Sequence, residues 1–163
     1  MGEDMCRHDQ HHLNRVADVC ADDSEVLALA VLRFVAAGYM TSDVACWDAA
    51  HDAAERALGP IEGPQFVATM TGIMRSIRRE CMREWRFLPA TCCRTTADEE
   101  RLIKIIAYAR HGFSSDAHEA AAALMGGVAT CLCDTVSSAA ERLNQLQTRL
   151  APSASQANRA SIH

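Results

Sequence analysis

Apolar positions along the chain recur at spacings of three and four residues, which is the period of an α-helix. Two segments show this period over most of their length. In residues 64–87 the apolar positions are Phe66, Met70, Ile73, Ile77 and Trp85, with Met74 and Cys81 beside them. In residues 128–150 they are Ala129, Leu132, Val136, Ala139, Leu143, Leu146 and Leu150. No segment alternates apolar and polar residues as a strand does, so the pattern predicts an all-α protein.

Capping residues and Gly–Pro breaks divide the chain into about six helices. We expect them at residues 24–40, 42–58, 64–87, 96–110, 114–125 and 128–150, with a short seventh helix near residues 12–20. Asp22 with Glu25, and Thr96 with Glu99, have the spacing of a capping box. The sequence therefore predicts a single-domain helical bundle at 13–150, between a flexible N-terminal segment at 1–12 and a disordered tail at 151–163.

Length and composition indicate one domain in a reducing compartment. The chain has 163 residues, of which 49% are hydrophobic, enough to bury a substantial core. No secretory signal is visible, and the apolar run at 26–40 is short for a membrane span and contains Arg33. We therefore expect a cytoplasmic protein that does not enter a membrane. In that compartment the eight cysteines should be thiols, metal ligands or redox centres, not disulfides.

Five cysteines are candidate metal ligands. The C-x₂₋₄-C pairs of familiar zinc sites are absent from the sequence. A site for zinc or another thiophilic metal would have to gather residues from separate segments, namely Cys81, Cys92 or Cys93, Cys131 and Cys133. In a regular helix Cys131 and Cys133 would point to opposite sides, which weakens this hypothesis. The competing interpretation is that all of these residues are buried structural thiols.

The same thiols support a second hypothesis, a thiol-dependent redox enzyme that uses Cys92/Cys93 or Cys131/Cys133. Arg86 and Arg94 lie close in sequence to Cys92 and Cys93, and neighbouring cations lower the pKa of a thiol. A disulfide between the adjacent Cys92 and Cys93 is disfavoured because its ring is strained.

Charge is unevenly distributed along the chain. The formal net charge is −5, yet residues 63–97 hold six basic and two acidic side chains. If the helix at 64–87 is regular, it carries a row of arginines opposite its apolar face: Arg75, Arg79, Arg83 and Arg86, with Arg78 beside them. Such a row suits an acidic protein surface or phosphates, although a solvated helix face is the simpler interpretation. The second helix of a possible helix-turn-helix, within 114–125, has no basic residue, so nucleic acid is not favoured as the partner.

These features favour a small helical interaction or regulatory protein over an enzyme, because no nucleotide-binding loop or nucleophile motif is present. We expect a protein partner or a second copy of the chain to dock on the arginine row and on the end of the last helix, at Leu143, Leu146 and Leu150. Burial of these leucines within the bundle is the alternative. A cysteine-based metal or redox switch would give the protein a sensing role. A nucleic-acid-associated regulator using the row from Arg75 to Arg86 is the third hypothesis.

Overall fold

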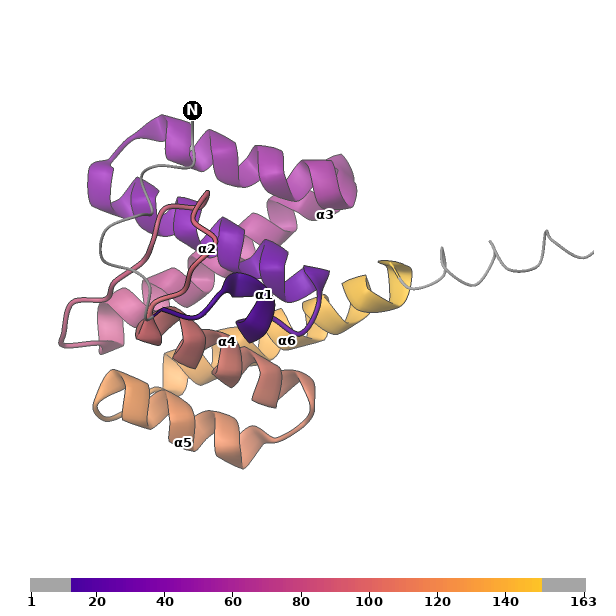
Figure 1. Cartoon of the computed structure of the whole chain (residues 1–163). Helices are drawn as coiled ribbons and strands as arrows, with labels where there is room; N and C mark the ends of the chain where they lie inside the picture. The colour runs from indigo at the N-terminus through magenta and orange to yellow at the C-terminus, as the bar shows by residue number, and fades with distance from the viewer. Residues whose placement is uncertain (1–12, 151–163) are drawn as a thin grey trace, which may run out of the picture.

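The structure is a computed structural model, and it describes residues 13–150. The segments predicted to be flexible or disordered, 1–12 and 151–163, lie outside the described residues. Within the described range the chain forms helices and no strand, apart from one isolated bridge between Arg15 and Arg94. The helices, shown in Figure 1, are α1 (Val16–Val19), α2 (Asp23–Thr41), α3 (Val44–Glu80), α4 (Ala97–Arg110), α5 (Ser114–Met125) and α6 (Thr130–Leu150). The predicted all-α bundle is confirmed.

Local start signals position α2 and α4 as predicted. The side chain of Asp22 accepts a hydrogen bond from the N–H of Glu25 at 3.0 Å at the start of α2. At the start of α4 both arms of the capping box are present. Glu99 N–H donates to Thr96 Oγ1 at 3.1 Å, and Thr96 N–H donates to Glu99 Oε2 at 2.8 Å.

The two helices predicted at 42–58 and 64–87 form one element, α3, that doubles back on itself at Gly59 (Figure 1). Gly59 has φ 85° and ψ 172°, a conformation essentially restricted to glycine. The second arm of α3 begins at Pro60, a residue that fits the first position of a helix, and Pro64 follows four residues later. The arms then approach closely at Gly63, where a Cβ atom would lie 2.7 Å from the backbone of Glu55.

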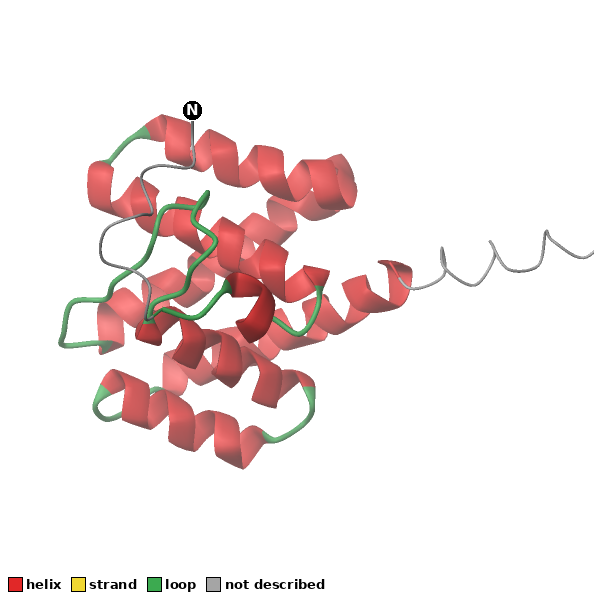
Figure 2. Ribbon diagram, viewed as in Figure 1, coloured by secondary structure: helices red, strands yellow, loops and turns green. Residues whose placement is uncertain are grey.

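The predicted end of the long helix at residue 87 is wrong. α3 ends at Glu80, and Cys81 already has extended backbone geometry. Residues 81–96 form the long loop between α3 and α4 in Figure 2. The physical reason lies in α4, because Asp98 binds the Arg83 side chain and the Arg86 N–H, and Glu99 binds the Leu88 N–H. These contacts hold the stretch away from helical geometry.

The core lies between α2 and α3 and continues between α6 and its neighbours α3 and α4. Its largest fully buried side chains include Leu29, Leu32, Phe66, Met70, Ile73, Leu102, Ile106, Leu132 and Leu143. In the described part of the chain, α2 is the one helix long and apolar enough to cross a membrane. More than half of that apolar stretch is buried inside the fold.

Candidate functional site

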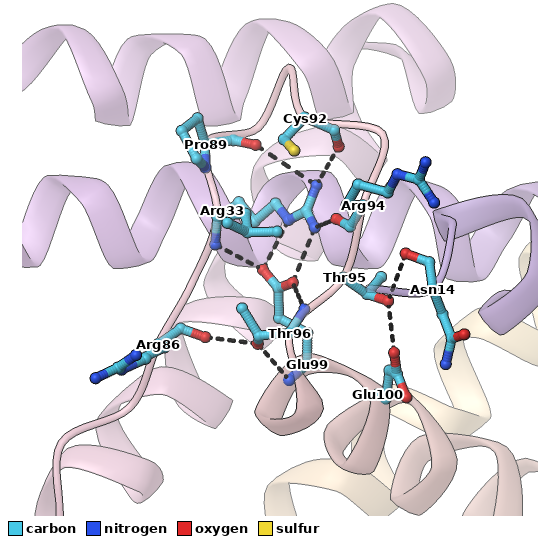
Figure 3. Close-up of polar contacts among 11 residues, drawn as sticks. Asn14, Arg33, Arg86, Pro89, Cys92, Arg94, Thr95, Thr96, Glu99 and Glu100 are labelled. Atoms are coloured by element: carbon cyan, nitrogen blue, oxygen red, sulfur yellow. Dashed lines mark hydrogen bonds and ion pairs between the residues drawn. The ribbon is translucent and has the colours of Figure 1, made fainter. Parts of the chain in front are cut away.

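The segment 81–96 is fastened to the core by a buried ion pair between Arg33 of α2 and Glu99 of α4. Their side chains are 2% and 0% exposed, and Arg33 Nε lies 2.8 Å from Glu99 Oε1. The guanidinium also donates to the backbone carbonyls of Pro89, Cys92 and Arg94 (Figure 3). Glu99 accepts in addition from the N–H groups of Leu88 and Thr96. A buried pair is tolerated when its remaining polar atoms are satisfied in this way.

A second ion pair fixes the start of the same segment. Arg83 binds Asp98 with both terminal nitrogens, at 3.1 and 2.6 Å. The hydrogen bonds from Arg83 hold the pKa of Asp98 below its usual value, against the opposing effect of partial burial. The guanidinium of Arg83 is therefore already paired with a carboxylate of the same chain.

The structure does not bring the five candidate metal ligands together. Cys81 follows the last residue of α3, Cys92 is buried and Cys93 is exposed in the segment 81–96. On α6 Cys131 is exposed and Cys133 is buried, as the helical geometry requires for residues two apart. Among residues 13–150 no group of three or more Cys, His, Asp or Glu side chains is arranged to hold a metal ion.

Three thiols are held in their protonated form by their surroundings. Burial raises the pKa of Cys20 to about 12, and burial also raises the pKa of Cys133. The hydrogen bond between Cys131 and the carboxylate of Glu80 raises the pKa of that thiol. Because the thiolate is the nucleophile, these surroundings do not favour Cys131 and Cys133 as a redox pair. At the other candidate pair, Cys92 and Cys93, the neighbouring Arg94 guanidinium donates a hydrogen bond to the carbonyl of Leu13, at 2.9 Å.

The predicted single row of arginines on one helix is wrong, because α3 ends at Glu80. Arg75, Arg78 and Arg79 lie on the exposed face of α3, whereas Arg83 and Arg86 lie beyond it in the segment 81–96. Figure 3 shows the Arg86 side chain directed away from the buried ion pair. Arg83 pairs with Asp98, but in the described part of the chain no carboxylate pairs with the other four arginines.

The leucines at the end of the last helix face the core. Leu143 is 0% exposed and Leu146 is 5% exposed, on the side of α6 that packs against α3 and α4. The side chain of Leu150 lies outside the described residues. Burial within the bundle removes Leu143 and Leu146 from the candidate surface for a partner.

An aromatic hollow lies where the end of α2 meets the end of α3 and the segment 81–96. Its volume is about 340 Å³ and its residues are Ala36, Tyr39, Met40, Met74, Ile77, Arg78, Cys81, Arg83, Trp85 and Phe87. The rings of Trp85 and Phe87 stack with 5.8 Å between their centroids. The same two rings and Met40 also line a neighbouring cavity, whose other residues are Leu13, Glu84, Arg86, Leu88, Thr96, Ala97 and Asp98. The two cavities are therefore adjacent and share the stacked rings as a wall, and together they are called the groove.

Packing around Gly38 positions the opposite wall of the hollow. Trp47 lies so close to Gly38 that a Cβ atom there would meet its indole nitrogen at 2.6 Å. From this position Trp47 contacts Tyr39 edge-on, with 5.1 Å between the ring centroids. The guanidinium of Arg78 lies over the Tyr39 ring, 4.3 Å from its centroid. The glycine thus allows the packing that places Tyr39 beneath Arg78.

Sequence reasoning missed the aromatic residues of this groove. It assigned Trp85 to the buried face of a helix, and it gave no role to Tyr39 or Phe87. A signal was present in "REWRF", residues 83–87, where charged and aromatic residues alternate directly before Pro89. Such a stretch is also consistent with an extended segment that places its two rings on one side.

No protein-family model, curated protein or solved structure matches the chain. The class of the molecule therefore follows from its own architecture. It is an all-α bundle with an arginine-rich, aromatic groove at the junction of α2, α3 and the segment 81–96.

Proposed function

We propose that this protein is a non-enzymatic interaction protein that binds an acidic segment of a partner protein. The docking surface consists of the groove residues Tyr39, Met40, Trp85 and Phe87 and of Arg78 and Arg86, which line the two cavities. Arg75 and Arg79 lie beside Arg78 on the exposed face of α3. The observation that carries the proposal is the state of the arginines that line the two cavities. Arg83 is paired with Asp98, whereas Arg78 and Arg86 lie beside exposed apolar and aromatic side chains and have no carboxylate partner among residues 13–150.

The side chains of the docking surface are of the types that dominate protein interfaces. Aromatic residues, Met and Arg are enriched at interface centres, and Trp, Tyr and Arg are the commonest hot spots. Met40 is 73% exposed although it is a large apolar side chain, and Met82 beside the groove is 96% exposed. Burying these side chains against a partner would remove apolar surface from water.

The chemistry of Cys131 and Cys133 does not favour them as the thiols of the redox alternative. The surroundings of Cys20, Cys131 and Cys133 all raise the thiol pKa, which is the opposite of what a reactive thiol requires. A protein partner also fits better than nucleic acid, because the basic residues surround an apolar groove within a chain of net charge −5.

Selection from a displayed library of random peptides tests this proposal on the full chain. We expect the selected peptides to combine Asp or Glu with large apolar residues. Arg78→Glu should weaken their binding by about tenfold or more, which corresponds to about 1.4 kcal/mol. The matched control is Arg56→Glu, which changes the charge of another exposed arginine of α3 by the same amount and should leave binding nearly unchanged.

Two results would contradict the proposal. One is a set of selected peptides that lacks acidic residues or binds the Arg78→Glu variant equally well. The other is tighter, steeply salt-dependent binding of duplex DNA that requires the same arginines, which would assign the surface to nucleic acid.

A further inference from the structure

We infer that the aromatic hollow takes one large apolar side chain of the partner, with an adjacent Asp or Glu carboxylate bound by Arg78. This inference rests on the proposed function and specifies the ligand of the same surface. It follows from three properties of the hollow. Its floor is apolar, several of its polar groups already have hydrogen-bond partners, and its Arg78 guanidinium pairs with no carboxylate of residues 13–150.

The floor of the hollow is apolar and already formed. Ala36 and Ile77 are each 2% exposed and Met74 is 4% exposed. A volume of about 340 Å³ lies at the lower end of the range for small-ligand pockets, so it suits a side chain and not a folded element. Met74 can adapt its shape to different apolar groups because its side chain is unbranched and flexible.

Three of the polar groups that line the hollow already have hydrogen-bond partners within the chain. The Trp85 indole N–H donates to Cys81 Sγ at 2.9 Å, and that thiol donates to the Arg83 carbonyl at 3.5 Å. The guanidinium of Arg83 is occupied by Asp98. A ligand therefore does not have to supply hydrogen bonds at these positions, and an apolar group can fill the space without leaving buried polar atoms unpaired.

Arg78 is the remaining charge at the hollow. Its guanidinium lies over Tyr39, and within the described range it pairs with no carboxylate. Contact with an aromatic ring does not use the N–H groups of a guanidinium as donors to a carboxylate, and these donors match the two oxygens of a carboxylate. With Arg83 also lining the hollow, a cationic ligand is disfavoured at the same position.

Three capped tetrapeptides provide the test: Ac-Ala-Phe-Glu-Ala-NH2 and its counterparts with Gln or Lys in place of Glu. Binding to the full chain is followed by protection of Cys81 from iodoacetamide, read by peptide mass spectrometry, and by the NMR shift of the Trp85 indole N–H. We expect the Glu peptide to protect Cys81 and shift Trp85 at about tenfold lower concentration than the Gln peptide. The Lys peptide should be the weakest of the three.

The preference for Glu over Gln should disappear in Arg78→Met and persist in Arg56→Met, a matched control at an exposed arginine of α3 that lines neither cavity. Equal binding of the three peptides, or a preference that survives Arg78→Met, would overturn the inference. If the tetrapeptides affect neither Cys81 nor Trp85 while longer acidic peptides still bind through Arg78, the inference fails and the proposed function stands. If the Glu preference is found but no library peptide depends on Arg78, the proposed function fails on its own.

Discussion

Arg33 carries a charge into the core of the protein, where its side chain is 2% exposed. Its five donors are matched by the Glu99 carboxylate and by three backbone carbonyls, so removing the guanidinium would affect both the core and the segment 81–96. Glu99 would then remain buried without its cation, and the carbonyl of Cys92 would lose a 2.7 Å hydrogen bond.

Arg33→Met is therefore expected to lower the free energy of unfolding by about 3–5 kcal/mol. Urea unfolding followed by circular dichroism measures this change. The control is Arg142→Met, which breaks the half-exposed pair with Glu62 and should cost less than about 1 kcal/mol. The double variant Arg33→Met/Glu99→Met should be less destabilised than Arg33→Met alone. A single variant as stable as the wild type would show that the buried pair does not hold the segment.

Glu80 links the end of α3 to the start of α6. Its carboxylate accepts hydrogen bonds from the N–H groups of Cys131, at 2.8 Å, and Leu132, at 3.1 Å. A carboxylate at this place satisfies unpaired donors of the first helical turn and interacts favourably with the helix dipole. The same carboxylate keeps the Cys131 thiol protonated.

Glu80→Ala should lower the stability of the protein and increase the reactivity of Cys131, because both depend on the Glu80 carboxylate. The loss of the cap should cost about 1 kcal/mol of stability. The pKa of Cys131 should fall, because the carboxylate that raises it is gone, and a larger thiolate fraction at pH 8 should speed alkylation of this residue. Mass spectrometry of iodoacetamide-treated protein reads the rate at Cys131. Glu141→Ala, on the exposed face of α6, should leave that rate unchanged. Identical rates in both variants would contradict this account.

Among the helical elements, α3 depends most on a single backbone conformation. The turn at Gly59 lets the two arms of α3 pack side by side, and it places Pro60 at the first position of the second arm. A Cβ atom at Gly59 would meet no other atom within 4 Å, so any cost of substitution must come from the backbone alone.

Gly59→Ala should destabilise the protein by about 1–3 kcal/mol, because alanine rarely adopts φ 85° with ψ 172°. Gly127→Ala is the matched control. A Cβ atom there also meets no atom within 4 Å, but the φ angle of Gly127 is not positive. Comparing the thermal unfolding of the two variants distinguishes the cost of backbone strain at Gly59 from the effect of adding a methyl group. Equal stability of the variants would mean that the turn tolerates other residues.

Sequence reasoning identified elements well where the signal was local. The capping pairs at Asp22 and Thr96 were found because their partners lie three residues away. It failed where distant residues determine the outcome. The apolar period continues to Trp85, yet the helix ends at Glu80 because Asp98 and Glu99 bind the residues that follow. The pair of Arg33 and Glu99 spans 66 positions, and no pattern in the sequence connects them.

At the scale of the whole molecule, the apolar stripe of α6 is part of one continuous core. The sequence period identified the stripe but could not say whether another chain or this chain covers it. The structure places Leu143 against α3 and α4, in the interior of the same bundle.

Leu143→Ala should therefore cost about 2–5 kcal/mol, as expected for a fully buried leucine. Its unfolding midpoint should be the same at low and high protein concentration, because no partner chain contributes to covering the stripe. Gln145→Ala, an exposed neighbour on the same helix, should change stability by less than about 0.5 kcal/mol. A midpoint that rises with concentration for the wild type and not for the variant would instead indicate a dimer built on this helix.

The segment 81–96 is held to the fold in large part by hydrogen bonds of its backbone. Several of its attachments to the fold use main-chain atoms, namely the N–H and carbonyl of Arg86, the N–H of Leu88 and the carbonyls of Pro89, Cys92 and Arg94. The side chains of Arg83, Arg94 and Thr95 supply further hydrogen bonds at its two ends. Every residue type supplies a carbonyl, and every type except proline supplies an N–H. The side chains of Arg86, Phe87 and Leu88 can therefore be exchanged over generations without removing these hydrogen bonds. The groove is in this sense a surface that can change on a fixed support, because substitutions at these positions can accommodate new partners while Arg33 and Glu99 stay as they are.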